Sequence, residues 1–331
     1  MPRDAWEVAI VAAAIVSLVS IVGTAFYITV IARQKLVVAT TTSLYDTGLL
    51  DAIEVQFEEK HNIDVYFVSV GTGIALQFAQ RGDADMILVH SPSQEFAFLE
   101  GGYGVNRKII AYNFFVIVGP NTDPAGIRGL SVTEGLSAIV SKGRNLQALW
   151  VSRGDNSGTH SKEKHLWDAA GFDWEEIRDE LDWFIETGSG MGSTLKTANE
   201  LQAYTLADIG TFLAYTSADP NLIPNLIELV TREDELLNVY SAIAINQTLH
   251  KEANFQGAIT FIKFLISKDG QYLIEEYGKD KYDKSLFFPA VDLLQSNADP
   301  ILAQMIRDFA FFENSECPPQ YRSMYPELYD V

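Results

Sequence analysis

The sequence predicts an α/β protein made of two lobes that follow an N-terminal membrane helix. Residues 8–32 contain no charged side chain. An apolar run, a polar turn and a segment with helical spacing occur in this order twice in succession, at 36–59 and at 63–79. Two further apolar segments, 108–119 and 239–245, are placed where the chain would leave a first lobe and return to it.

The uncharged stretch at 8–32 is longer than the roughly 20 residues that span a bilayer and than the ~7–15 apolar residues of a secretory signal. We therefore expect an uncleaved single-pass helix in the cell membrane, with a long signal peptide cleaved near Ala32 as the alternative. Arg33 and Lys35 favour an inside C-terminus, but long domains are translocated largely regardless of charge. We therefore set the charge rule aside and expect the rest of the chain to be extracytoplasmic.

Composition limits the classes of function. The chain has 331 residues, of which 47% are hydrophobic and 21% charged, enough for two folded domains of ordinary size. The formal net charge of −20, without a basic cluster, argues against a nucleic-acid partner. The one cysteine, Cys317, allows no intrachain disulfide, and the histidines and acids show no metal-ligand spacing. We expect neither a metal nor a cofactor.

The first strand, turn and helix unit contains the most informative motif. Leu36–Val38 is an apolar, β-branched run typical of a buried strand. Leu49, Ile53 and Phe57 follow at helical spacing. Between them lie four consecutive hydroxyl residues, 40–43. Helix capping uses only one or two side chains, so we interpret this turn as an anion site at the start of a helix.

The second unit joins the strand Ile63–Val70 to a helix through Gly71, Thr72 and Gly73. Glycine lets a backbone approach a ligand closely, and Thr72 adds a hydroxyl. A third apolar strand follows at Asp85–His90. Parallel strands end at the same edge of a sheet, where α/β proteins bind ligands. The two polar turns are therefore expected to converge there.

The division into lobes follows from the breaks in the pattern. Prolines at 120 and 124 interrupt the chain after the long apolar segment. Two lobes joined by two crossings form a hinged cleft that closes around a small solute. We assign 1–34 to the membrane helix, 35–118 with 240–311 to lobe I, 119–239 to lobe II and 312–331 to a C-terminal extension that forms an extended contact segment.

Further elements are predicted within these lobes. Apolar runs indicate strands, helical spacing indicates helices, and glycine indicates turns. Lobe II is predicted to contain a segment at 129–141, strands at 148–151 and 183–186, a helix after Gly158, a glycine-rich turn at 188–193 and a helix at 194–205, while a helix at 255–266 and a segment at 271–277 complete lobe I.

A second donor-rich turn lies at 152–161 in lobe II. Arg153 follows a predicted strand, and Ser157 and Thr159 lead into a helix. The guanidinium fork can give two parallel hydrogen bonds, which suits a tetrahedral dianion. The alternative for Arg153 is an ion pair with Asp155 or another neighbouring acid.

Catalysis is not expected. The run GDNSG at 154–158 does not have the glycine spacing of a nucleophile elbow, and no base can be predicted because His160 and His165 lie on the following helix. A hydrolase that uses Ser157 is kept only as an alternative. The run GSGMGST at 188–194 lacks the lysine and the spacing of a phosphate-binding loop. We assign no catalytic residue.

Taken together, these motifs resemble the tungstate-binding receptor proteins of ABC importers, within the oxyanion class of type II periplasmic binding proteins. The resemblance covers about 36–289 and implies a two-lobed receptor that delivers tungstate, or less readily molybdate, to ABC permease subunits. Sulfate and phosphate would be excluded by fit, and protonated phosphate also by a lack of acceptors. The motifs are Ala39–Asp51, Val70–Leu76, Gly82–Pro92, Ser152–Glu163, Gly188–Leu195 and Ala203–Asp208.

The resemblance also implies the ligand donors, drawn from both lobes. One departure keeps another role open: Ile209 stands where the family has a basic residue. The alternative is a structural, adhesive or filament-forming surface protein that self-associates and uses the binding-protein fold as a scaffold. The implied donors are Thr41, Thr42, Ser43 and Thr72 from lobe I and Arg153, Ser157 and Thr159 from lobe II.

Overall fold

The computed structural model describes residues 6, 10, 13–18, 20, 33–231, 233–296 and 298–329. Most of the predicted membrane helix at 8–32 lies outside these residues. Where the structure is described, no helix has both the length and the apolar character needed to cross a membrane.

The strands form one large mixed sheet and one separate pair. They are β1 (Gln34–Thr41), β2 (Ile63–Val70), β3 (Met86–Val89), β4 (Gly104–Pro120), β5 (Trp150–Ser152), β6 (Phe184–Glu186), β7 (Thr205–Asp208), β8 (Leu226–Thr231), β9 (Leu237–Ile245) and β10 (Phe288–Pro289). The large sheet has the order β10, β4, β9, β3, β1, β2, and β7 and β8 also pair with β4. β5 and β6 are parallel and form the separate pair.

Helices connect most of the strands. The α-helices are α2 (Thr42–Tyr45), α3 (Leu49–Lys60), α4 (Thr72–Arg81), α5 (Pro92–Glu100), α6 (Val132–Gly143), α7 (Gly158–Ala169), α8 (Trp174–Arg178), α9 (Met191–Leu201), α10 (Ile209–Ala218), α11 (Phe255–Ile266), α12 (Lys268–Glu276), α13 (Lys279–Tyr282), α14 (Val291–Ser296) and α15 (Pro300–Ala310). The 3-10 helices are η1 (Asp234–Leu236), η2 (Pro319–Tyr321) and η3 (Pro326–Leu328).

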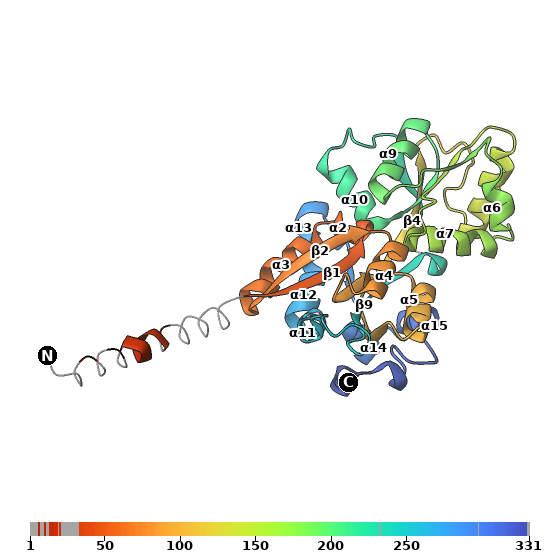
Figure 1. The fold of residues 1–331 in the computed structure, drawn as a ribbon. Helices are drawn as coiled ribbons and strands as arrows, with labels where there is room; N and C mark the ends of the chain where they lie inside the picture. Colours follow the sequence, from red (N-terminus) through yellow and green to blue (C-terminus); the bar gives the residue numbers. More distant parts are fainter. Residues whose placement is uncertain are drawn as a thin grey trace.

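The long strand β4 divides the molecule into two halves. Up to Phe114 it pairs with β9, and from Phe115 it pairs with β7 and β8. We call the half around β1, β2, β3 and β9 lobe I and the half around β5 to β8 lobe II; Figure 1 shows lobe II, with α6, α7, α9 and α10, above lobe I. The chain passes between the halves at Phe114 and Phe115, and the exact lobe boundaries assigned from the sequence stay a prediction.

The sheet of lobe I is covered on both faces because successive strand residues point to opposite sides. Leu36 and Val38 of β1 pack in one core with α3 and α11. Ala39 packs in another core with α4 and α5. Lobe II has its own core, which contains the buried Trp150, Trp167 and Trp183.

The parallel register brings the two polar turns together. Thr41 at the end of β1 is paired with Val70 at the end of β2. Thr40 is paired with Leu88 of β3. The turns that follow β1, β2 and β3 therefore leave the same edge of the sheet, as the sequence predicts.

The helix predicted at 194–205 is displaced in the structure. Helix α9 starts at Met191, inside the glycine-rich turn, and ends at Leu201. Gln202 then adopts a left-handed conformation with φ of 51° and stops the helix. The following residues form β7, to which the sequence prediction assigned no strand, because Tyr204 to Leu206 can pack in a helix or in a strand equally well.

The C-terminal extension packs on lobe I. Nη1 of Arg107 in β4 donates to the carbonyl oxygen of Glu316 at 2.8 Å. Lys108 forms an ion pair with the Glu316 carboxylate at 2.7 Å. The hydroxyl of Tyr329 donates to the carbonyl oxygen of Arg107 at 2.9 Å. These contacts tie the end of the chain to the first strand that crosses between the lobes.

Candidate anion-binding site

The four hydroxyl residues at the end of β1, 40–43, differ in their contacts and in their burial. The Thr40 hydroxyl donates to the carbonyl oxygen of Leu88 at 3.1 Å and belongs to the sheet. Thr41 caps α2, and its Oγ1 accepts from the backbone N–H of Leu44 at 3.3 Å. Thr42 is half-buried at the start of α2, and Ser43 is fully buried. Helix capping, the ordinary explanation of such residues, therefore applies to Thr41.

The second polar turn starts helix α4. Thr72 is its first residue, and the Thr72 hydroxyl is buried with no hydrogen-bond partner among the residues that the structure describes. A Cβ atom on Gly73 would lie 2.6 Å from Nδ2 of Asn156 in lobe II. Gly73 therefore lies against the turn of the opposite lobe, and the expectation that it lets the backbone approach a ligand stays a prediction.

The lobe II turn is held in a defined shape by its own hydrogen bonds. Ser157 caps α7, and its Oγ accepts from the N–H of His160 at 3.2 Å. The N–H of Ser157 donates to Oδ1 of Asp155 at 3.1 Å, and the N–H of Asn156 donates to Nδ1 of His160 at 2.9 Å. Asn156, with φ of 55°, lies in the left-handed region that asparagine tolerates. The turn thus presents Arg153 at one end and the start of α7 at the other.

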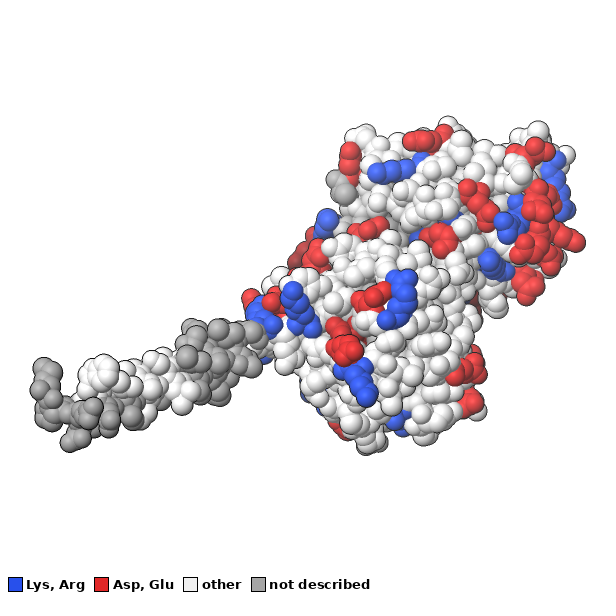
Figure 2. All heavy atoms as spheres, in the orientation of Figure 1, with Lys and Arg blue, Asp and Glu red and all other residues white. Residues whose placement is uncertain are grey.

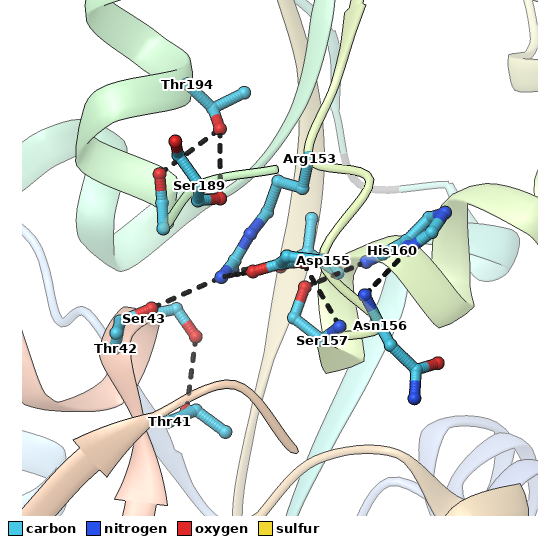
Figure 3. Close-up of polar contacts among 12 residues, drawn as sticks. Thr41, Thr42, Ser43, Arg153, Asp155, Asn156, Ser157, His160, Ser189 and Thr194 are labelled. Carbon is cyan, nitrogen blue, oxygen red and sulfur yellow. Dashed lines mark hydrogen bonds and ion pairs between the residues drawn. The ribbon is translucent and has the colours of Figure 1, made fainter. Parts of the chain in front are cut away.

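Arg153 of lobe II contacts lobe I (Figure 3). Its Nη2 donates to Oγ1 of Thr42 at 3.3 Å and pairs with Oδ2 of Asp155 at 2.6 Å. Nη1 donates to Oγ1 of Thr159 at 3.4 Å, and Nε is buried without a partner in the described part of the chain. Burial lowers the pKa of Arg153, which Asp155 opposes, and an arginine still keeps its charge.

The ion pair with Asp155, kept open as an alternative for Arg153, is therefore present together with the contact to lobe I. The Asp155 carboxylate beside the guanidinium is also a hydrogen-bond acceptor. This corrects the expectation that the site lacks acceptors. The Asp155 side chain is 16% exposed. Asp46 is a second nearby acid: burial raises its pKa, and Arg153 lowers it. The positive charge of Arg153 is therefore already partly balanced.

The structure brings the predicted residues of both lobes to one place. Thr42 contacts Arg153, Gly71 lies against Asp155 and Ser157, and a Cβ atom on Gly190 would lie 3.4 Å from Oγ1 of Thr42. The start of α9, at the glycine-rich turn, thus borders the site, although the sequence analysis assigned it no role. Of the seven predicted donors, Thr42 and Thr159 contact Arg153, Ser157 lies against Gly71, and Thr72 follows that glycine. Thr41 and Ser43 contact each other at the end of β1.

His90 was missed by the sequence analysis. It follows β3 directly and is buried, with Nε2 at 3.1 Å from Oγ of Ser43 and Nδ1 at 2.9 Å from Oδ1 of Asn238. Its position at the end of the third strand was the available signal. Ile209, at the position where a basic residue was expected, is partly buried and packs against apolar residues of both lobes. It adds no donor.

Acidic residues outnumber basic ones by 44 to 24 in this chain. Figure 2 shows acidic and basic side chains scattered over the face in view, with a dense acidic group at the outer end of lobe II near α6. Together with the net charge of −20, this field repels anions at long range. Any anion bound in the seam must therefore be held by the local donors.

Comparison with known proteins places the chain in a family. A model described as the PBP superfamily domain matches residues 28–269. A Haloferax volcanii protein named for anion binding in an ABC transporter is 44% identical over 257 residues, covering 77% of this chain and 72% of the relative. The tungstate-binding protein TupA of Peptoclostridium acidaminophilum is 40% identical over 258 residues, covering 78% of this chain and 86% of the relative.

A solved structure agrees with these relatives. The tungstate ABC transporter protein from Geobacter sulfurreducens has a TM-score of 0.66 and 38% identity, and the match covers 74% of this chain and 100% of that chain. Two α/β halves with donors on both sides of a seam define a solute-binding protein of the periplasmic type. The chain belongs to the PBP superfamily. The mixed α/β binding-protein fold and the family predicted from the motifs are thereby confirmed.

Proposed function

We propose that this protein is the extracytoplasmic receptor of an ABC importer and that it binds tungstate, or molybdate, between its two lobes. One observation carries the proposal. The buried guanidinium of Arg153 in lobe II lies 3.3 Å from the hydroxyl of Thr42 in lobe I and 3.4 Å from that of Thr159. Relatives named for tungstate or anion binding support the choice of ligand.

The donors match the needs of a tetrahedral dianion. Thr72 Oγ1 and Arg153 Nε are buried without partners among the described residues, so each has a hydrogen bond left to give. The N-termini of α4, α7 and α9 add backbone N–H groups and the positive ends of helix dipoles. Hydrogen bonds to a charged group contribute about 1.5–3 kcal/mol each. A few such bonds suffice for tight binding without a metal or cofactor.

Ligand choice would follow from the size of the oxoanion. Oxoanions of equal charge differ mainly in bond length, so the spacing between the lobes selects among them. The carboxylate of Asp155 repels any anion that approaches Arg153 from its side. The contacts of Gly73 with Asn156 and of Thr42 with Gly190 would limit how far the lobes close. Each contact joins a residue of 35–118, in lobe I, to one of 119–239, in lobe II, which supports the proposed division, in which 240–311 completes lobe I.

We also propose that the N-terminal segment tethers the receptor to the membrane beside the permease subunits. The described residues of this segment expose large apolar side chains, including Trp6 and Leu18. The described residues before Arg33 are drawn white in Figure 2, because none of them is charged. Fractionation tests the tether: the full-length chain should sediment with membranes, and a chain starting at Arg33 should not. Equal distribution of both chains would contradict it.

Calorimetry with four anions tests the binding proposal. The purified full-length chain is titrated separately with tungstate, molybdate, sulfate and phosphate. We expect strong binding of tungstate, weaker or equal binding of molybdate, and little heat from the other two. Equal, weak heats for all four would refute the proposal. Filaments seen by microscopy, together with absent heats, would instead support the adhesive role.

A further inference from the structure

A chain of buried hydrogen bonds leads from the hydroxyl run into the hinge between the lobes. Oγ of Ser43 lies 3.2 Å from Oγ1 of Thr41 and 3.1 Å from Nε2 of His90. Nδ1 of His90 lies 2.9 Å from Oδ1 of Asn238. All four side chains are buried. The direction of each proton in this chain decides which hydroxyls can donate to a ligand.

The direction is fixed at Asn113 of β4. Its Nδ2 lies 3.2 Å from the carbonyl oxygen of Leu286 and 3.1 Å from Oδ2 of Asp208. A carbonyl oxygen can only accept, so the amide nitrogen of Asn113 must face it. Oδ1 of Asn113 then points to Asn238, whose Nδ2 donates to it at 2.9 Å.

The same reasoning orients Asn238. Its Nδ2 also lies 2.9 Å from Oδ2 of Asp208, and reversing the amide would place oxygen against oxygen at Asn113. Such a buried, unsatisfied pair is costly. Oδ1 of Asn238 therefore faces His90, and because an amide oxygen only accepts, Nδ1 of His90 carries the proton.

The position of the proton on His90 then determines to which atom each neighbouring hydroxyl donates. Burial, together with the charge of Arg153 and against the hydrogen bond to Asn238, lowers the pKa of His90 to about 4. The ring is therefore neutral at pH 7 and has one N–H. With that proton on Nδ1, Nε2 is an acceptor, and the hydroxyl of Ser43 donates to it. Ser43 has no second hydroxyl proton, so the contact with Thr41 is a bond donated by Thr41 to Ser43.

We propose that His90 is a positioning residue that turns the hydroxyl protons of Thr41 and Ser43 away from the ligand. The inference rests on the proposed function and divides its hydroxyls into two groups. Thr42 accepts from Arg153 and keeps its own proton free. Thr72 has no partner in the described structure. These two hydroxyls, rather than those of Thr41 and Ser43, donate to the oxoanion from lobe I.

The ring of His90 is held by both lobes. It stacks on the ring of Tyr240 in β9 with centroids 4.8 Å apart. On another side, a Cβ atom on Gly158, the first residue of α7, would lie 2.8 Å from Cε1 of His90. Lobe II therefore lies directly against the ring, which keeps Nε2 directed at Ser43 while the lobes are together.

The tautomer of His90 can be measured directly. We would label the full-length protein with ¹⁵N-histidine and record its imidazole nitrogen shifts by NMR at pH 7; His90→Asn identifies the resonance among the five histidines. We expect a protonated Nδ1 and a bare Nε2. A proton on Nε2, or on both nitrogens, would overturn the inference. The spectrum needs no ligand, so its result is separate from the success or failure of tungstate binding.

Binding measurements supply the second test. Thr72→Val should weaken tungstate binding by about tenfold or more, because a hydrogen bond to a charged ligand is lost. Ser43→Ala should weaken it by less than about threefold, because its hydroxyl gives that ligand no bond. Thr41→Val carries the same expectation and replaces Ser43→Ala if circular dichroism shows that variant to be unfolded. An equal or larger loss in these variants than in Thr72→Val would overturn the assignment.

Discussion

Replacement of Arg153 by glutamine removes the fixed positive charge of the site while keeping a polar, though shorter, side chain. The Arg153 side chain is 1% exposed, and it is paired with Asp155 at 2.6 Å. Without the guanidinium, the Asp155 carboxylate stays in the seam with no cation beside it. An entering dianion would then lose its charge partner and meet an uncompensated like charge.

The size of the effect follows from the hydrogen bonds that the variant loses. If the guanidinium of Arg153 donates two charge-assisted hydrogen bonds to the dianion, at about 1.5–3 kcal/mol each, their loss costs about 3–6 kcal/mol. At about 1.4 kcal/mol per factor of ten, the Kd for tungstate should rise by roughly 10²–10⁴-fold. Thr159→Ala removes only a weak partner of Arg153, 3.4 Å away, and should cost less than about tenfold.

Calorimetry measures both variants, and Arg144→Gln provides the matched control. Arg144 is an arginine of lobe II whose side chain is 54% exposed and pairs with Glu180 on the surface. A double variant with Asp155→Asn should recover part of the affinity lost in Arg153→Gln, because the repelling charge is gone. The reasoning fails if Arg153→Gln binds within tenfold of the wild type, or if Thr159→Ala loses as much.

Three further perturbations follow from the geometry. Gly73→Ala should weaken tungstate binding by about fivefold or more, because its Cβ atom would lie 2.6 Å from Nδ2 of Asn156 and displace that side chain of lobe II. Gly71→Ala, with ordinary contact distances, should have a smaller effect. The reverse order would contradict this account of closure. Burial lowers the pKa of His160 from 6.5 to about 4, so between these pH values the unfolded chain binds more protons than the folded chain. The melting temperature should therefore fall as the pH drops from 6.5 to 4. His160→Asn should make the melting temperature depend less on pH in this range. Glu316→Gln breaks the ion pair between Lys108, 7% exposed, and Glu316, 12% exposed. It should lower the free energy of unfolding by about 1–3 kcal/mol in chemical denaturation without changing anion affinity. A loss of affinity would show that the C-terminal extension acts on the site.

Much of the fold could be predicted because local patterns specify it. Leu49, Ile53 and Phe57 are buried on α3 as their spacing indicates. The strand Ile63–Val70 has the predicted bounds. The helix after the glycine-rich turn was misplaced, because nothing local distinguishes its last residues from the strand β7.

The site was harder to predict in detail. Position in the chain indicated that Thr42 and Arg153 belong to facing lobes, and the structure places them in contact. Gly73 was expected to let the backbone approach a ligand; that Asn156 of lobe II packs against it is visible only in the structure. His90 was not selected, because a single histidine after a strand has no local feature that separates a structural role from a binding role.

The sequence by itself determined the α/β class, the convergence of two polar turns at one sheet edge, and the residue types that can donate to an anion. These follow from periodicity and turn chemistry, which act over a few neighbouring residues. Only the tertiary structure decided the ion pair between Arg153 and Asp155, the fit of Gly73 against lobe II and the partners of His90. These depend on groups far apart in the chain, and on the directions in which buried hydrogen bonds must run.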